Sequence, residues 1–417
     1  MIRSILLVGI CLATFGSALL AADWPQFRGP NRDGGTEDSG TPTQWDDSTN
    51  LLWKQKLGGH GSSSPIVVGG KVFLTSYSGY GLDERNPGDQ SSLVRHVLAF
   101  DLGTGKPAWD FPANASLPEE NFQGFQALHG YASSTPASDG NLLYVFLGKN
   151  GVGALTLDGK PRWSQSVGTG KHNWGSGTSP VIHKNLVIVN ASVEGSGLVA
   201  LNKLTGKQVW AQKGVRSAWN SPVLVTPASG KTEVVISSQG EILAYDADSG
   251  QPAWRCPGVK DYVCPTVLVH EDVVYAIGAR AGMGVAVKAG GTGNVSPLWE
   301  MGKGSNVSSP VFHGGHLYWA HEGRGIVYCA DAKTGEIVYE ERLQPNPDRI
   351  YASAVLAGDK IYYVSRNRGV YVVAADPQFK LLAHNQPLDS SVFNASPAVV
   401  DGKLLLRSNE YLYCLGK

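Results

Sequence analysis

Aromatic and basic side chains recur in this sequence just before a step from a small residue to proline. Examples of that step are Ser64-Pro65, Ser179-Pro180 and Ser309-Pro310. The residues before the successive steps are His129, Tyr131, His172, Trp174, Arg216, Trp219, Lys260, Tyr262, Asn306, Arg349, Tyr351 and Asn394. Aromatic faces stack on flat ligands and attract cations, while guanidinium and ammonium groups donate charge-assisted hydrogen bonds. Brought together, these residues form either a binding rim or a set of side chains that fill a channel.

Two other patterns resemble metal sites, but each has a structural explanation. Residues 246–250, Asp-Ala-Asp-Ser-Gly, begin like a calcium loop, yet they lack the distant glutamate that completes one. His313, His316 and His321 straddle a Gly-Gly turn and a strand, without a cysteine or carboxylate at the spacing of a zinc site. We therefore predict no metal site and no catalytic residue from these patterns.

The elements that position the rim are repeats, which the small-residue–proline steps mark. The full series of steps is Ser64-Pro65, Thr135-Pro136, Ser179-Pro180, Ser221-Pro222, Cys264-Pro265, Ser309-Pro310, Ser353-Ala354 and Ser396-Pro397. The first interval is 71 residues and the others are 42 to 45 residues, so the first repeat carries an insertion. Regular self-similarity at this period indicates a repeat architecture. The inserted stretches 77–94 and 112–126 are either binding loops or inert solvated loops.

Each repeat reads as four short strands, with a hairpin turn of the form Asp-x-x-Ser/Thr-Gly before the fourth strand. Residues 246–250 and 331–335 are two such turns. The aspartate accepts hydrogen bonds from the following backbone, and the glycine supplies the positive φ that the turn needs. An aromatic residue follows in the fourth strand, and we expect it to pack between neighbouring sheets. The predicted docking residues are Trp53, Trp109, Trp163, Trp210, Trp254, Trp299 and Tyr339.

These units predict an all-β, eight-bladed β-propeller with four-stranded antiparallel blades, because such units bury their faces only when arranged radially. The last unit supplies only three strands, so residues 50–53 are expected to complete it and close the ring. The predicted organisation is a signal peptide at 1–22, an extended segment at 23–49 and a single propeller at 50–417.

The repeats resemble the tryptophan-docking repeats of the PQQ-like (pyrroloquinoline quinone repeat) propeller family, within the quinoprotein alcohol dehydrogenase-like superfamily. Residues 243–254 and 199–210 carry this resemblance, which extends over nearly the whole chain after residue 22. The opening stretch 23–34, Asp-Trp-Pro-Gln-Phe-Arg-Gly-Pro-Asn-Arg-Asp-Gly, is similar to the mature start of many exported bacterial members.

The resemblance implies one of two functions. One branch of the family contains dehydrogenases that hold PQQ, usually with Ca²⁺, in a central funnel and oxidise alcohols or sugars. The other contains non-catalytic propellers such as BamB, of the outer-membrane barrel-assembly machinery. This chain has no adjacent cysteine pair and no long funnel insertions, and the calcium ligands and catalytic Asp of a dehydrogenase do not map onto it. We therefore expect a non-catalytic binding or scaffolding propeller, with the PQQ-dependent enzyme and a carbohydrate-binding propeller as alternatives.

The ends and the composition set the compartment and exclude some partners. Arg3, an apolar run over 5–20 and small residues at 21–22 have the order of a secretory signal peptide, with a membrane anchor as the alternative. Positive and negative charges balance, which gives no field for nucleic acid. The sequence thus predicts an exported, monomeric protein of the periplasm or cell envelope that binds an envelope protein or small ligand at its channel rim. No cofactor is expected, and Cys256 and Cys264 are close enough in sequence to pair.

Overall fold

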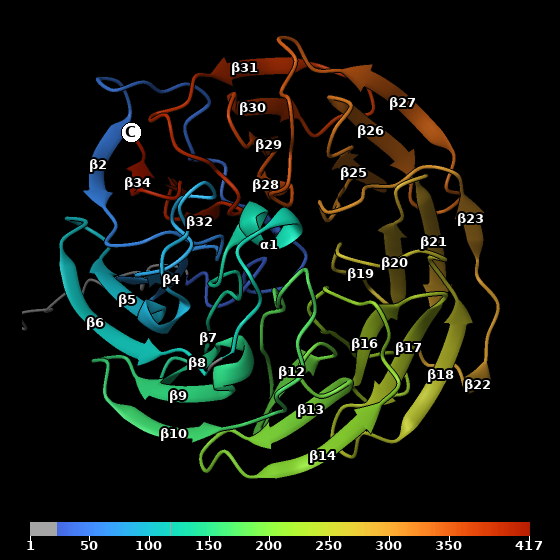
Figure 1. Cartoon of the computed structure of the whole chain (residues 1–417). Coiled ribbons are helices and arrows are strands. Elements are labelled where there is room, and N and C mark those ends of the chain that lie inside the picture. The colour runs from blue at the N-terminus through green and yellow to red at the C-terminus, as the bar shows by residue number, and fades with distance from the viewer. Residues whose placement is uncertain (1–22, 117) are drawn as a thin grey trace, which may run out of the picture.

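The computed structural model describes residues 23–116 and 118–417 and shows a ring of eight blades (Figure 1). The prediction of an all-β, eight-bladed propeller is confirmed. The predicted signal peptide, residues 1–22, lies outside the described residues. In the described ranges the helical elements are the short helix α1 (Gly124–His129) and the 3-10 turns η1 (Gln90–Ser92) and η2 (Gly148–Asn150). None of them has the length and apolar character to cross a membrane.

In each blade four strands follow one another from the ring centre outward, and each pairs antiparallel with the next. Blade one contains β3 (Ile66–Val68), β4 (Lys71–Ser78), β5 (Val94–Asp101) and β6 (Pro107–Asn114). Blade two contains β7 (Ala137–Ser138), β8 (Leu142–Phe146), β9 (Val152–Thr156) and β10 (Pro161–Gln165). Blade three contains β11 (Val181–His183), β12 (Leu186–Ala191), β13 (Gly197–Asn202) and β14 (Gln208–Lys213). Blade four contains β15 (Val223–Val225), β16 (Glu233–Ser238), β17 (Glu241–Asp246) and β18 (Pro252–Pro257).

The second half of the ring repeats this pattern. Blade five contains β19 (Leu268–His270), β20 (Val273–Gly278), β21 (Met283–Lys288) and β23 (Trp299–Met301). Blade six contains β24 (Val311–His313), β25 (His316–Ala320), β26 (Ile326–Asp331) and β27 (Ile337–Arg342). Blade seven contains β28 (Val355–Ala357), β29 (Lys360–Ser365), β30 (Gly369–Ala374) and β31 (Leu381–Asn385). Blade eight contains β32 (Ala398–Val400), β33 (Lys403–Arg407), β34 (Tyr411–Leu415) and β2 (Leu51–Lys56). The two-residue strands β1 (Gly35–Thr36) and β22 (Gly293–Asn294) add in parallel to β28 and β18.

Strand β2 closes the ring, as predicted. It pairs antiparallel with β34, so that Leu51 lies opposite Leu415 and Trp53 opposite Cys414. The last blade therefore combines strands from both ends of the described chain, and its β34 edge is covered.

The apolar core lies between neighbouring blades, because each four-stranded sheet buries both of its faces. Ile188 and Trp210 of blade three, for example, belong to the same buried cluster as Ile236 of blade four. All four cysteines in the described ranges are free thiols, so Cys256 and Cys264 do not pair in the structure.

The predicted docking residues connect successive blades at their outer strands. The indole Nε1–H groups of Trp53, Trp109, Trp163, Trp210 and Trp299 each donate to a carbonyl of the next blade's hairpin, at 2.8–3.2 Å. The turn glycine of that hairpin lies under the indole. At Gly206, for example, φ is 71° and an added Cβ would lie 2.6 Å from the Trp163 ring. Glycine is therefore required there both for its φ and for the close approach of the ring.

Two predicted docking residues make different contacts. Trp254 Nε1 donates to the Glu233 carboxylate of its own blade at 2.7 Å, because blade five lacks the Asp-x-x-Ser/Thr-Gly turn. The Tyr339 ring packs on Phe379 of blade seven, with ring centroids 5.7 Å apart.

A ring of eight hydrogen bonds joins the blades at the centre. The backbone N–H of one Ser or Thr per blade donates to the side-chain oxygen of its counterpart in the next blade, at 2.9–3.2 Å, and the last returns to the first. The members are Ser64, Thr135, Ser179, Ser221, Thr266, Ser309, Ser353 and Ser396. We call this set the hydroxyl ring.

The hydroxyl ring corrects the repeat register in blade five. The sequence pattern matched Cys264-Pro265 with the other small-residue–proline steps, but Thr266 occupies the ring position. Strand β19 begins two residues after Thr266, just as β24 begins two residues after Ser309. The position requires a hydroxyl that accepts a hydrogen bond, and a thiol is a weak acceptor. The proline that follows most members is not required.

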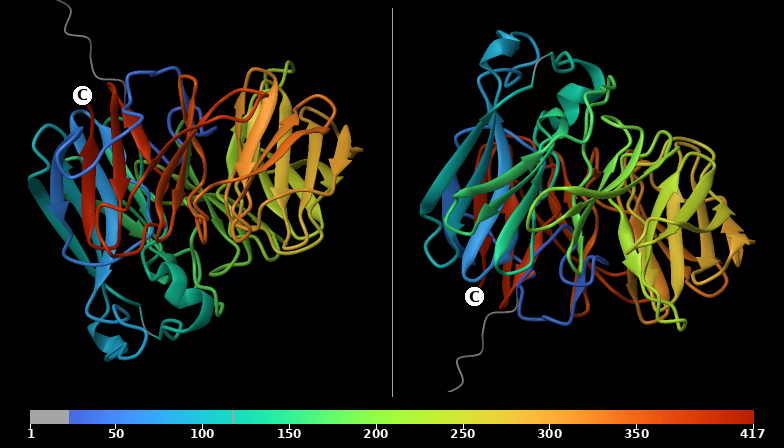
Figure 2. Two further views of the ribbon diagram at one scale, coloured as in Figure 1. Left: turned by 90° about the horizontal axis from the view of Figure 1, so that it is seen from above. Right: turned by 90° about the horizontal axis from the view of Figure 1, so that it is seen from below.

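The chain between residues 23 and 41 crosses the face of the propeller opposite α1 (Figure 2). Trp24 exchanges two backbone hydrogen bonds with Val67 of blade one, each 2.9 Å. The buried Arg28 guanidinium donates to the carbonyl oxygens of Asp33 and Pro310, the latter before blade six. Burial lowers the pKa of Arg28 to about 10. This N-terminal segment therefore contacts several blades and lies under the ring centre.

Candidate functional site

A central pocket with a volume of about 210 Å³ lies on the ring axis between α1 and the N-terminal segment. Its floor consists of the hydroxyl ring and the Phe27 side chain. Its walls consist of Trp174, Trp219, Tyr262 and Tyr351, and Phe125 and Leu128 of α1 lie at the mouth. The pocket is therefore a dead end rather than a pore through the propeller.

The structure brings seven of the twelve predicted rim residues together in the wall of this pocket. They are His129, Trp174, Trp219, Tyr262, Asn306, Tyr351 and Asn394. They come from different blades because each lies in the loop that leads into an innermost strand, and these loops converge on the ring axis.

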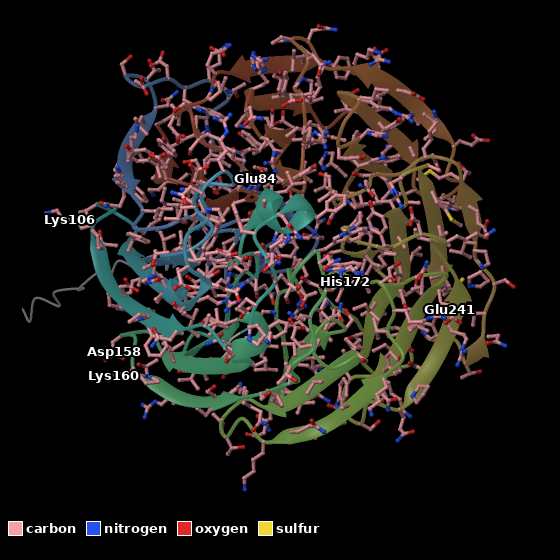
Figure 3. The ribbon with its side chains drawn as sticks, viewed as in Figure 1. Glu84, Lys106, Asp158, Lys160, His172 and Glu241 are labelled. Carbon is pink, nitrogen blue, oxygen red and sulfur yellow. The ribbon has the colours of Figure 1, made fainter. Side chains whose placement is uncertain are left out.

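Of the other predicted rim residues, two contact the pocket wall from outside: the His172 ring centroid lies 4.9 Å from that of Trp219, and Arg349 Nη1 donates to the Tyr351 hydroxyl at 3.0 Å. His172, Arg216, Lys260 and Arg349 are exposed and do not line the pocket. Figure 3 shows His172 near the middle of the ring, whereas the labelled charges Lys106, Asp158 and Lys160 lie at its outer edge.

Tyr131 is buried in the insertion and is not a rim residue. Its ring packs against Tyr77, Tyr80 and Phe122, with centroids 5.3–6.1 Å away, and its hydroxyl donates to the Glu120 carbonyl at 2.6 Å. Tyr131 is therefore surrounded by the inserted loops of blade one and does not face the channel.

The aromatic wall is centred on Trp174. Its ring centroid lies 4.4 Å from Tyr262, 4.7 Å from Phe125 and 4.8 Å from Trp219. Phe125 is 45% exposed and lies in the inserted stretch 112–126, which the sequence offered as either a binding loop or an inert loop without singling out this residue. These rings present apolar faces to the pocket.

Hydrogen bonds fix α1 above the pocket. His129 Nδ1 lies 2.6 Å from Ser133 Oγ, and its Nε2 lies 2.7 Å from the Trp174 carbonyl oxygen. Burial lowers the pKa of His129 and favours a neutral imidazole. Because a carbonyl only accepts, Nε2 carries the proton.

Arg366 and Asn394 hold the other side of α1. Both donate to the Leu128 carbonyl oxygen, at 3.1 and 2.8 Å, and Arg366 also donates to Asn394 Oδ1 at 2.7 Å. The Arg366 guanidinium lies 4.8 Å from the centre of the Tyr351 ring. The side-chain hydrogen bonds of His129 and Asn394 therefore position the helix. The side chains of Trp174, Tyr262 and Asn306 also line the pocket and make fewer such hydrogen bonds.

The pocket lining is electrically neutral. In the described part of the chain no Asp, Glu, Lys or Arg lines it, and His129 is held neutral. PQQ is a polycarboxylate, and Ca²⁺ prefers several carboxylate or carbonyl oxygens. No group of three or more His, Cys, Asp or Glu residues suited to a metal ion occurs within the described ranges. The lining residues therefore do not fit PQQ bound with Ca²⁺.

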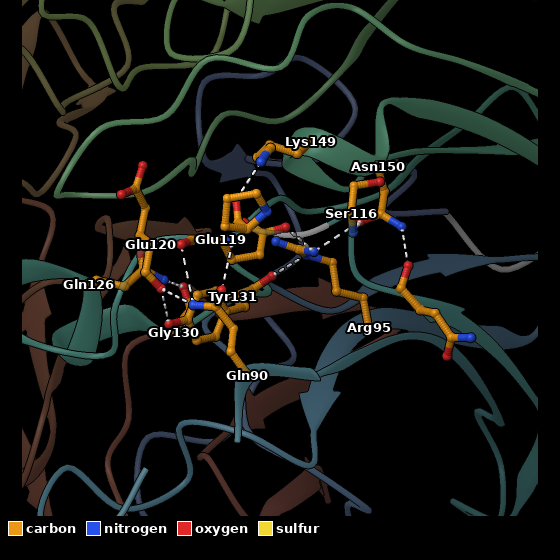
Figure 4. Close-up of polar contacts among 12 residues, drawn as sticks. Gln90, Arg95, Ser116, Glu119, Glu120, Gln126, Gly130, Tyr131, Lys149 and Asn150 are labelled. Atoms are coloured by element: carbon orange, nitrogen blue, oxygen red, sulfur yellow. Dashed lines mark hydrogen bonds and ion pairs between the residues drawn. The ribbon is translucent and has the colours of Figure 1, made fainter. Parts of the chain in front are cut away.

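A second, smaller cavity of about 30 Å³ lies beside the central pocket, with Ser133 in both linings. Figure 4 shows the polar contacts of several of its lining residues. Arg95 Nη1 donates to Glu119 at 2.8 Å and to Asn150 Oδ1 at 3.0 Å, and Arg95 Nε donates to the Tyr131 carbonyl at 3.0 Å. Arg95 and Glu119 are 4% and 6% exposed, so their ion pair is buried. This pair ties the insertion to blade one.

Glu194 lies in the wall of the same cavity and carries a perturbed carboxyl group. It is 5% exposed, and burial raises its pKa to about 7. One of its carboxylate oxygens has no hydrogen-bond partner within the described residues. The folded protein therefore favours the protonated form of Glu194 near neutral pH.

Glu194 predicts a pH dependence of stability. Between the usual glutamate pKa of 4.5 and about 7, the folded protein binds more protons at this site than the unfolded chain. The contribution of Glu194 to the free energy of unfolding is therefore full at the acid end of this window and is lost as the pH rises. The loss is expected to be roughly 3 kcal/mol. In Glu194→Gln, urea unfolding measured across the window should no longer show this fall in the free energy of unfolding. The exposed control Glu336→Gln should retain it, and identical curves for both variants would contradict the assignment.

Comparison with known proteins places this geometry among propellers. The family profile described as outer membrane protein assembly factor BamB matches residues 35–173 and 94–341. The outer membrane protein assembly factor BamB of Burkholderia pseudomallei is 24% identical over 375 residues, which cover 77% of this chain and 86% of that protein.

Two solved structures share the fold. BamB from Moraxella catarrhalis superposes with a TM-score of 0.61 at 15% identity, covering 88% of this chain and 97% of that chain. The quinohemoprotein alcohol dehydrogenase from Comamonas testosteroni gives 0.67 at 13% identity, covering 96% and 81%. At these identities the solved structures show the fold alone, and one fold carries both an assembly factor and a dehydrogenase.

Proposed function

The chain belongs to the PQQ-like propeller family described as outer membrane protein assembly factor BamB, as its repeats predicted, and from that premise we propose that it is a non-catalytic binding propeller. It acts in the cell envelope, after export, and associates with proteins of outer-membrane assembly. The neutral lining of the central pocket supports the absence of quinone catalysis, and the similarity to outer membrane protein assembly factors BamB supports the association. Quinone chemistry of the dehydrogenase branch requires charged groups at that place.

The association is tested in the organism that encodes the chain. Deletion of the gene is expected to lower the amounts of β-barrel proteins in the outer membrane, measured by quantitative mass spectrometry of membrane fractions. Expression of the full chain should restore them, and crosslinking should link it to a known outer-membrane assembly protein. Unchanged β-barrel levels together with no such crosslink would overturn the proposal.

The absence of catalysis is tested separately, by titrating the purified chain with PQQ and Ca²⁺. Trp174 and Trp219 line the pocket, so their fluorescence would report a bound quinone. We expect no saturable change. Saturable quenching that disappears in Trp174→Ala would instead support a PQQ-dependent dehydrogenase and a screen of alcohols and sugars.

A further inference from the structure

The central pocket combines two surface types that together select a particular ligand chemistry. Its walls are aromatic, with Trp174, Trp219, Tyr262 and Tyr351 around the axis. Its floor is polar but neutral, because it is built from Ser and Thr side chains of all eight blades. A purely apolar ligand would cover the walls but leave the floor without hydrogen-bond partners.

The floor has unused hydrogen-bonding capacity. Each hydroxyl oxygen of the hydroxyl ring accepts one backbone N–H, and none of the eight donates its own proton to an acceptor in the described chain. The Oδ1 atom of Asn306, also in the lining, is buried and has no partner there. The pocket therefore offers a ring of rotatable donors and at least one acceptor to a bound molecule.

The charge and shape of the pocket further restrict the class of ligand that it can bind. Without Lys or Arg in the lining, an anionic ligand would lose hydration without gaining a counterion, and without Asp or Glu a cationic ligand would gain only contacts with the aromatic rings. Because Phe27 and the N-terminal segment close the far end, a polymer enters only by one of its ends or by a loop. A peptide end brings an ammonium or carboxylate group, whereas the end of a neutral sugar chain brings only hydroxyl groups and apolar ring faces.

We propose that the central pocket binds a neutral saccharide, either a single sugar or the end of a short oligosaccharide. The apolar faces of the sugar pack on Trp174 and Tyr262, and its hydroxyl groups bond with the hydroxyl ring and Asn306. This inference rests on the proposed function in that the pocket is a binding site without catalysis. It concerns a small ligand on the ring axis, separate from the docking of assembly proteins.

Gly177 provides a position at which a larger side chain narrows the pocket and its Cβ meets no close contact. It lines the pocket in a backbone conformation that other residues tolerate, and an added Cβ would meet only Ser133 Cβ, at 3.7 Å. Gly177→Leu therefore fills the pocket with a branched side chain, while Gly177→Ala serves as the matched control that leaves most of its volume free.

Binding is measured by calorimetry on the full chain with neutral mono- to trisaccharides of glucose, galactose and N-acetylglucosamine. Saturable binding to at least one of them is expected. Gly177→Leu and Trp174→Ala should each weaken it by about tenfold or more, and Gly177→Ala by only about twofold. The corresponding uronic acids should bind about tenfold more weakly than the neutral sugars.

Two outcomes would overturn the inference. One is that no neutral saccharide in the set binds saturably. The other is that neutral peptides bind instead and that Gly177→Leu abolishes this binding. The occupant would then be a protein loop. Both outcomes leave the deletion phenotype untouched, so failure of the saccharide site and failure of the proposed function are distinguishable.

Discussion

Replacing Arg95 with methionine is expected to lower the free energy of unfolding by about 3–5 kcal/mol, because it leaves a buried carboxylate without its counterion. Arg95 is the ion-pair partner of Glu119, and both side chains are almost fully buried. The substitution also removes donors from the Tyr131 carbonyl and from Asn150. Urea unfolding measures the loss, and limited proteolysis should show earlier cleavage within the insertion.

The matched control is Arg255→Met in an exposed pair. Arg255 and Glu241 are 3.6 Å apart and 59% and 35% exposed. Exposed pairs contribute about 0–1 kcal/mol, so this variant should stay close to the wild type. Combining Arg95→Met with Glu119→Leu should recover part of the loss, since the unpaired charge is then gone. Equal destabilisation by the two arginine variants would refute the role assigned to the buried pair.

Gly206→Ala is expected to cost about 2–4 kcal/mol, the larger part from displacing the Trp163 ring and the rest from backbone strain. The added Cβ would lie 2.6 Å from that ring at a φ of 71°. Because the same ring bridges two blades, its displacement weakens their junction rather than one turn. Thermal and urea unfolding both report the effect.

Gly140→Ala isolates the strain component. Gly140 has a φ of 85°, but an added Cβ there meets nothing within 4 Å. Its cost should be roughly 1 kcal/mol. In a double-mutant cycle, Trp163→Leu should partly relieve Gly206→Ala, giving a favourable coupling energy. Additive losses would mean that the glycine serves the turn alone.

The fold was predictable because each repeat carries the same local signals. The turn glycines, the docking tryptophans and the unfinished last unit together specify eight blades and the closure by β2. The rim was predictable only as a set of positions near the axis. The pattern includes side chains such as Trp174 that face the pocket, but also Arg216 and Lys260, which point to solvent.

The remainder of the site could not be predicted because it comes from segments outside the repeats. Phe27 belongs to the N-terminal segment, and Phe125 to the stretch 112–126, which the sequence named as a possible binding loop. A repeat register does not specify where such segments fold or which of their side chains reach the pocket. The Cys264-Pro265 match failed for a different reason, since a local pattern cannot show which residue supplies the hydroxyl that accepts from the adjacent blade. The burial of Glu194 likewise depends on long-range packing.

The pairing of β2 with β34 also dictates an order of folding. Leu51 of β2 pairs with Leu415 of β34, which is far away in the sequence. Strand β2 therefore stays unpaired until β34 is available. Closing so long a loop is slow compared with forming the hairpins inside each blade. The ring is therefore expected to close last, and a chain that lacks β34 would leave β2 without its partner and the ring open, while the neighbouring blades still pack on one another.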